Sequence, residues 1–248
     1  MCGIAGLLGP VGDRSGEALE AAAQAMSDRL SHRGPDGRGI WSDPAQGVAL
    51  GHRRLAVVDL SDAGAQPMVS HDGRWVMSYN GESYNAEAMV AAMPAGHRSA
   101  LVGHSDTEVL LETISAIGVV PALERMVGMF ALAVWDRQSH ELWLARDRFG
   151  EKPLYHGRAG RTLVFGSELK ALHAVDGFAP DIDRNSVTDL LKWGCIPAPK
   201  TIYDGVSKVR PGHVLRFDSS GRRSEDITYW SSLEVASEAV VGVERGED

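Results

Sequence analysis

Residues 129–146 read Met-Phe-Ala-Leu-Ala-Val-Trp-Asp-Arg-Gln-Ser-His-Glu-Leu-Trp-Leu-Ala-Arg, and this stretch decides the class of fold. Two apolar runs of strand length, Met129–Asp136 and Glu141–Arg146, flank the polar residues 137–140. Two such runs joined by a short polar turn predict an antiparallel hairpin.

Further strands of the same kind are predicted on both sides of this hairpin. They cover residues 4–8, 48–59, 74–79 and 162–165. Helices are predicted between the strand runs, one capped by Asp13 or Ser15 and another beginning with the capping pair Ser105 and Glu108. Hairpin-like strand runs separated by helices favour an α+β fold with antiparallel sheets over a parallel βαβ fold.

Composition excludes several classes of protein. The 248 residues include 25 Lys plus Arg and 33 Asp plus Glu, giving a net charge of −8, which argues against an electrostatic nucleic-acid binder. No apolar run approaches the roughly 20 residues that a membrane-spanning helix needs. With two cysteines, Cys2 and Cys195, and no secretory signal pattern, we expect a reducing, cytoplasmic location.

Metal and phosphate sites are not predicted. The chain has nine histidines. No short pair with ligand-like spacing and no accompanying cysteine is found among His32, His52, His71, His97 and His104. The glycine-containing segment 34–39 lacks the lysine of a phosphate-binding loop.

Cys2 is the first candidate catalytic residue. It follows Met1 and precedes Gly3, and a small second residue permits removal of the initiator methionine. The freed α-amine could then take the proton of the thiol on the same residue, directly or through a water, which makes a nucleophile and its base. A cysteine near a terminus is by itself unremarkable, so this interpretation depends on the motifs elsewhere in the chain.

Three other segments could complete a site around such a nucleophile. Asn80-Gly81 most simply predicts a tight turn, yet an Asn amide and a Gly N–H could also stabilise an oxyanion. Arg53 and Arg54 should point to opposite faces of a strand, so one of them could bind a carboxylate inside the protein. Asp106, at a predicted helix start, could either cap that helix or hold an ammonium group.

Together these segments resemble the class II glutamine amidotransferases of the N-terminal nucleophile hydrolase superfamily, and most closely the glutaminase domain of glutamine-hydrolysing asparagine synthetases. The resemblance runs in order through roughly residues 2–230. The matching segments are 1–4, 32–36, 51–55, 64–68, 80–85, 105–109, 128–131, 145–150, 152–155, 167–170 and 210–213. One departure is Ser83, where that branch usually carries an aliphatic residue; we interpret it as a change in packing.

The resemblance implies a fold and a role for each matching residue. The fold would be a four-layer αββα sandwich of two antiparallel sheets over residues 2–175. Cys2 would attack the side-chain amide of L-glutamine, and Asn80 and Gly81 would form the oxyanion hole. The remaining substrate-binding residues would be Arg54 for the α-carboxylate, backbone around Leu55, Val57 and Val58, and Glu82 and Asp106 for the α-ammonium group.

The resemblance also implies a second activity that this sequence lacks. The ATP-dependent synthetase domain of the family carries a Ser-Gly-Gly-x-Asp-Ser loop, and no such string occurs before Asp248. Residues 176–248 are therefore expected to be a connector towards a synthetase domain, present in cis or in trans. ATP and Mg²⁺ would belong to that domain, and no cofactor is expected in this chain.

Several alternatives remain open at this stage. The ammonia acceptor could be aspartate, giving asparagine, or another carboxylate. A non-catalytic relative that keeps the fold as a scaffold or regulator is a further alternative, although Cys2, Arg54, Asn80, Gly81, Glu82 and Asp106 are all present. The sequence also leaves open whether Met1 is removed and whether the protein forms a homodimer.

Overall fold

The hairpin that decides the fold class is formed as predicted. In the computed structural model, which describes residues 1–56 and 62–237, β6 (Gly128–Asp136) pairs antiparallel with β7 (Glu141–Arg146). The register places Asp136 opposite Glu141. Asp136 also accepts two hydrogen bonds from the Arg74 guanidinium, at 2.9 and 2.6 Å, which ties the hairpin end to the residue before the neighbouring strand β5 (Trp75–Ser83).

Two six-stranded antiparallel sheets are built from the strands of the described chain. The first has the order β10-β8-β9-β1-β3-β2. Its strands are β1 (Gly3–Leu8), β2 (Gly37–Asp43), β3 (Val48–Arg54), β8 (Tyr155–Ala159), β9 (Thr162–Gly166) and β10 (Ser207–Lys208). The second has the order β12-β11-β7-β6-β5-β4. Its further strands are β4 (Met68–Val69), β5 (Trp75–Ser83), β11 (His213–Phe217) and β12 (Arg223–Thr228).

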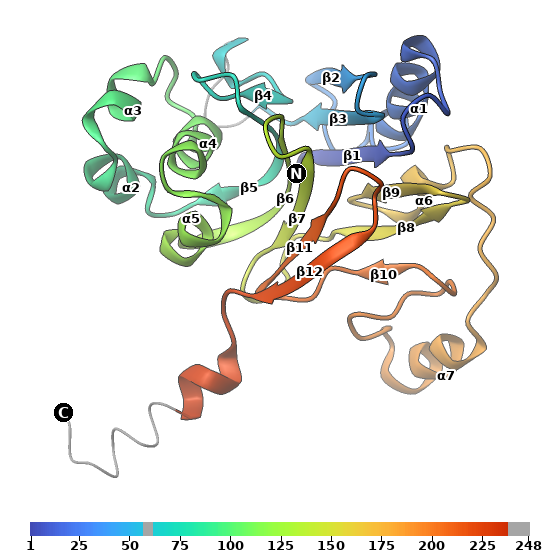
Figure 1. Ribbon diagram of the computed structural model, residues 1–248. Coiled ribbons are helices and arrows are strands. Elements are labelled where there is room, and N and C mark those ends of the chain that lie inside the picture. Colours follow the sequence, from blue (N-terminus) through green and yellow to red (C-terminus); the bar gives the residue numbers. More distant parts are fainter. Residues whose placement is uncertain (57–61, 238–248) are drawn as a thin grey trace.

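The helices lie outside the two sheets (Figure 1). They are α1 (Gly16–Asp28), α2 (Ala86–Ala92), α3 (Ala95–Ala100), α4 (Asp106–Ile117), α5 (Val119–Arg125), α6 (Leu169–Leu172) and α7 (Arg184–Trp193), with a 3-10 turn at Asp62–Gly64. None of the helices in the described residues is long and apolar enough to cross a membrane.

Three buried clusters define four layers. Apolar residues of both sheets, including Leu50 and Trp135, fill the space between the sheets. A second cluster joins the outer face of the first sheet to α1 and α6, and a third joins the outer face of the second sheet to α2, α4 and α5. The protein is therefore an αββα sandwich, which confirms the predicted fold class.

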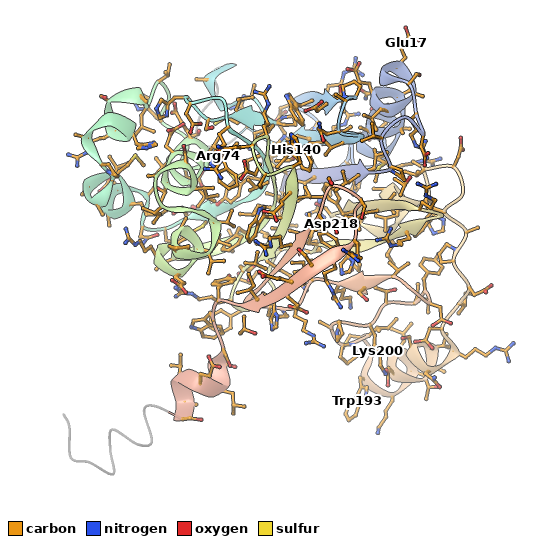
Figure 2. The ribbon with its side chains drawn as sticks, viewed as in Figure 1. Glu17, Arg74, His140, Trp193, Lys200 and Asp218 are labelled. Carbon is orange, nitrogen blue, oxygen red and sulfur yellow. The ribbon has the colours of Figure 1, made fainter. Side chains whose placement is uncertain are left out.

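Local signals explain where α1 begins and which face it buries. The Ser15 side chain accepts the Ala18 N–H at 3.2 Å, so Ser15 is the N-cap. Leu19 and Met26, spaced for one helix face, are buried against the first sheet. Glu17, in the first turn, points away from the sheets (Figure 2).

The sandwich extends beyond the expected boundary at residue 175. The strands β10, β11 and β12 belong to residues 176–248, yet they add to both sheets. These strands carry weak sequence signals because β10 has two residues and β12, at a sheet edge, reads Arg-Ser-Glu-Asp-Ile-Thr and is mostly exposed. The role of this region as a connector stays a prediction.

Helix α7 contributes little to the buried core. Ser186 is its buried residue, and Trp193 at its end is 61% exposed and lies at the outer edge of the molecule (Figure 2). The predicted strand 48–59 ends at Arg54 in the structure; its last residues, 57–59, lie outside the described residues.

Candidate active site

A cavity of about 270 Å³ collects most of the residues that the sequence singled out. They come from the start of β1, the end of β3, the second half of β5 and the first turn of α4. The lining residues with a predicted role are Cys2, Arg54, Leu55, Asn80, Gly81, Glu82 and Asp106. Val57 and Val58 lie outside the described residues.

The Cys2 thiol is held by the backbone of a neighbouring strand. Because β1 and β3 are antiparallel with Gly3 opposite Arg53, Cys2 comes next to the end of β3, where Arg54 is followed by Leu55. The Leu55 N–H donates to Cys2 Sγ at 3.4 Å, and Sγ lies 3.7 Å from the Leu55 carbonyl oxygen. The thiol is half-buried, and Met1, 56% exposed, also lines the cavity.

The polar loop at residues 32–37 fixes both chain segments that meet at the thiol. Arg33 Nε donates to the Cys2 carbonyl at 3.0 Å, and the Asp36 carboxylate accepts the Ala56 N–H at 3.0 Å. A Cβ at Gly34 would lie 2.4 Å from the Arg53 carbonyl carbon, so only glycine allows this close approach. The loop therefore sets the distance between Cys2 and Leu55.

Asn80 provides an unpaired donor inside the cavity. Its side chain lines the cavity, the residue is 2% exposed, and its Nδ2 has no hydrogen-bond partner in the structure. A buried amide nitrogen without a partner is costly, so such groups are found where a ligand or reacting atom supplies the acceptor. The Nδ2 group is thus poised to donate to a group that enters the cavity.

The turn predicted at Asn80-Gly81 is not formed; both residues lie inside β5, paired with Ala131 and Phe130 of β6. The glycine is required by close packing instead. A Cβ at Gly81 would lie 2.5 Å from the Met129 carbonyl oxygen and 2.7 Å from the Phe130 Cβ. The Asn-Gly pair therefore reflects a crowded strand rather than a hairpin turn.

The N–H groups of alternate β5 residues point away from β6. The Tyr79 N–H donates to Gln66 Oε1 at 2.6 Å, and the Ser83 N–H donates to Asp106 Oδ2 at 2.8 Å. Because N–H direction alternates along a strand, the Gly81 N–H points to this same side. Gly81 and the Asn80 amide are thus adjacent donors beside the cavity that holds the Cys2 thiol.

The two arginines at the end of β3 diverge as predicted. Arg53 Nη2 contacts Asp28 of α1 at 2.7 Å. Arg54 lines the cavity instead. Its guanidinium brings a positive charge to the cavity, which suits a carboxylate.

Two carboxylates, Glu82 and Asp106, lie in the same cavity lining. Asp106 is not the cap of α4, because the Ser105 side chain accepts the Glu108 N–H at 3.2 Å. Burial raises the pKa of Asp106, the Ser83 N–H and Tyr79 hydroxyl offset part of that rise, and the Glu82 charge adds to it. A cation placed between the two carboxylates would relieve their repulsion.

Ser83 has the packing role expected of it. Its hydroxyl lies 3.4 Å from Asn85 Oδ1 and 3.7 Å from Met89 Sδ, so the side chain faces α2 rather than the cavity.

Some lining residues were not assigned a role from the sequence. Gln66 donates to Thr107 Oγ1 at 3.3 Å while accepting the Tyr79 N–H, so it fixes the first turn of α4 on β5. Lys152 is 7% exposed and its Nζ lies 3.4 Å from Met1 Sδ. Both belong to segments of the family resemblance, which was the available signal. Among the described residues that line the cavity there is no histidine.

His52 lies behind the cavity, between the sheets. Its Nε2 donates to the Tyr79 carbonyl at 3.0 Å, while Nδ1 is buried without a partner. Burial lowers the pKa of His52 to about 4, with the Tyr79 bond opposing the shift and the Arg54 charge adding to it. The imidazole is therefore neutral at neutral pH.

The fold is an αββα sandwich, and its cavity holds a thiol on the second residue, an unpaired hydrogen-bond donor, and charged groups that suit the carboxylate and the ammonium group of an amino acid. These features define the class of N-terminal nucleophile amidotransferases. Residues 1–230 match the glutamine amidotransferase domain family, and the chain belongs to that family. It is a class II glutamine amidotransferase domain.

Relatives support this assignment. The chain is 36% identical over 244 residues to asparagine synthetase (glutamine-hydrolysing) 3 of Bacillus subtilis, covering 96% of this chain and 37% of the relative. It is 33% identical to amidase chry2 of Gibberella zeae, covering 93% of this chain and 34% of the relative. The chain thus spans little more than a third of the length of these proteins.

A solved structure has the same fold. Glutamine phosphoribosylpyrophosphate amidotransferase from B. subtilis matches with a TM-score of 0.67 and 20% identity, covering 93% of this chain and 50% of that chain.

Proposed function

We propose that this chain hydrolyses L-glutamine to glutamate and ammonia through a thioester on Cys2. The observation that carries the proposal is the shared cavity, in which the Cys2 thiol lies with the unpaired Asn80 amide donor and with charged groups of both signs. Arg54 would bind the α-carboxylate, and Glu82 with Asp106 would bind the α-ammonium group. The side-chain amide would then reach the thiol.

The chemistry follows from these positions. Once Met1 is removed, the Cys2 α-amine takes the thiol proton, and Sγ attacks the amide carbon. The negative charge that forms on the amide oxygen is stabilised by Asn80 Nδ2 and the Gly81 N–H. The protonated amine gives its proton to the leaving nitrogen and ammonia departs. Water, deprotonated by the same amine, then hydrolyses the thioester to release glutamate.

We further propose that the ammonia passes to an ATP-dependent synthetase domain, in cis or in trans, which converts aspartate to asparagine. The names of the bacterial relatives support this acceptor. A different carboxylate acceptor is the second candidate, supported by the relative named as an amidase. The cytoplasmic location and any homodimer stay predictions.

The proposal is tested by intact mass and glutamate release. We expect a purified chain that lacks Met1, that releases glutamate and ammonia in equal amounts, and that gains the mass of one glutamyl group when quenched during turnover. Cys195, exposed and remote from the cavity lining, supplies the matched control. Cys195→Ala should retain the activity and Cys2→Ala should lose it.

Two results would overturn the mechanism. One is full activity in a chain that still carries Met1, because its Cys2 nitrogen lies in a peptide bond. The other is equal glutamate release by the wild-type chain and Cys2→Ala, which would favour a scaffold or regulatory role.

A further inference from the structure

Two histidines and a glutamate meet outside the catalytic cavity. His71 lies in the turn between β4 and β5, His97 lies on α3, and Glu112 lies on α4, the helix next to α3 (Figure 1). One possible ligand atom of each side chain lies within 4.8 Å of the others. His71 and His97 are 41 and 15 residues from Glu112 along the chain, so no short sequence motif predicts this group.

The Glu112 carboxylate is buried and held in one orientation. Its side chain is 4% exposed, and Oε1 accepts a hydrogen bond from the backbone N–H of His71 at 2.8 Å. This bond leaves Oε2 facing both imidazoles. Oε2 contacts His71 Nδ1 directly and lies 3.2 Å from His97 Nδ1. Backbone hydrogen bonds of this kind are how proteins orient metal-binding carboxylates.

The two rings are arranged so that both Nδ1 atoms converge on the same oxygen. The ring centroids are 4.9 Å apart and the planes are nearly perpendicular, at 86°. Nitrogen ligands from imidazole with one carboxylate oxygen suit Zn²⁺, Co²⁺ and Ni²⁺, whereas Mg²⁺ and Ca²⁺ prefer oxygen ligands. The donor set therefore selects for a transition-metal ion.

One separation between possible ligand atoms is close to that of a tetrahedral site. With bonds of about 2.0–2.2 Å, neighbouring ligand atoms lie about 3.4 Å apart. The 3.2 Å separation of His97 Nδ1 and Glu112 Oε2 is near this value. The His71 ring must shift to match it, and its side chain is 39% exposed, which leaves it room to adjust.

We propose that His71, His97 and Glu112 bind a divalent transition-metal ion of the Zn²⁺ type, with water at the fourth position. Asp72 is not a ligand, because Ser70 Oγ and the Arg74 N–H bind its Oδ1 and Ser115 Oγ binds its Oδ2. The ion ties α3 and the β4–β5 turn to α4.

The proposal is tested on the full, tag-free chain that carries Cys2→Ala and Cys195→Ala, which removes both thiols as competing ligands. Zn²⁺ binding is titrated calorimetrically, and Co²⁺ binding is followed by its visible absorption. We expect one ion per chain. His71→Gln and His97→Gln should each weaken binding at least tenfold, because even changes in groups that only support ligands cost about 10–100-fold. Zn²⁺ should raise the melting temperature of the parent and not of these variants.

His213→Gln is the matched control, since His213 pairs with the Asp226 carboxylate at 2.7 Å and, among the described residues, belongs to no group of three possible metal ligands. It should bind Zn²⁺ like the parent. Circular dichroism verifies that each variant is folded. The proposal is refuted if the parent binds no stoichiometric Zn²⁺, or if either His71→Gln or His97→Gln binds as tightly as the parent.

Discussion

Replacing Asn80 by alanine should separate an effect on catalysis from an effect on folding. Asn80 is 2% exposed, and its Nδ2 has no partner in the folded protein. Asn80→Ala therefore removes a donor that makes no hydrogen bond in the free enzyme. In the proposed mechanism, that donor acts once charge develops on the amide oxygen of bound glutamine.

The expected loss of activity follows from this difference between the free enzyme and the transition state. Loss of one oxyanion donor costs about 10²–10³ in kcat, equivalent to about 2.7–4 kcal/mol of transition-state stabilisation. KM for glutamine should change little, because the interaction is made in the transition state and not in the ground state. The free energy of unfolding should change by less than about 1 kcal/mol, since no satisfied hydrogen bond is lost.

Ser78 is the matched control, because it lies two residues earlier on the same face of β5. Its buried hydroxyl donates to the Gly51 carbonyl of the first sheet at 3.3 Å, and it does not line the cavity. Ser78→Ala should lower the free energy of unfolding by about 1 kcal/mol and keep kcat within about twofold.

Steady-state glutamate release and urea unfolding of both variants provide the measurements. The reasoning fails if Asn80→Ala keeps more than about a third of the wild-type kcat, or if its loss of activity is entirely in KM. It also fails if Ser78→Ala loses as much activity as Asn80→Ala.

Three further outcomes are expected. Arg54→Met should raise KM for glutamine at least about tenfold, because a hydrogen bond to a charged group is lost. Arg53→Met should leave KM unchanged. Glutamate release measured across substrate concentrations checks both variants. Gly81→Ala should lower the urea midpoint and the activity together, because its Cβ would meet the Met129 carbonyl oxygen at 2.5 Å. Since burial lowers the pKa of His52 from 6.5 to about 4, the unfolded state binds more protons in that range. Stability should therefore fall by up to about 3 kcal/mol as pH drops from 6.5 to 4, and His52→Gln should flatten this dependence in unfolding curves.

The parts of the fold that the sequence predicts are those with a strong local pattern. The hairpin of β6 and β7, the cap of α1 at Ser15 and the start of α4 at Ser105 all depend on residues within a few positions of one another. The edge strand β12 was missed because it buries little apolar surface. It forms a strand through its pairing with β11, and its composition does not indicate this pairing.

The site was predictable in its residue types and not in its geometry. Asn80-Gly81 is the pair that most favours a hairpin turn, yet both residues lie within β5. What overrides the local preference is contact with Met129 and Phe130 of β6, almost 50 residues further along the chain. Such a contact cannot be read from the local sequence, so the turn prediction was wrong although the strand before it was predicted.

The position of Cys2 depends on contacts at even larger sequence separations. Ser167 Oγ accepts the Ile4 N–H at 3.0 Å, which fixes the start of β1, and Arg33 bonds the Cys2 carbonyl while pairing with Glu168 at 2.9 Å. Burial would raise the pKa of Glu168, but hydrogen bonds from Arg33, His32 and Lys170 outweigh it and lower the pKa to about 2. The carboxylate is therefore charged near neutral pH, where it can pair with the Arg33 guanidinium. Because Glu168 does not titrate near neutrality, the pH dependence of glutamine hydrolysis in that range should report groups other than this carboxylate.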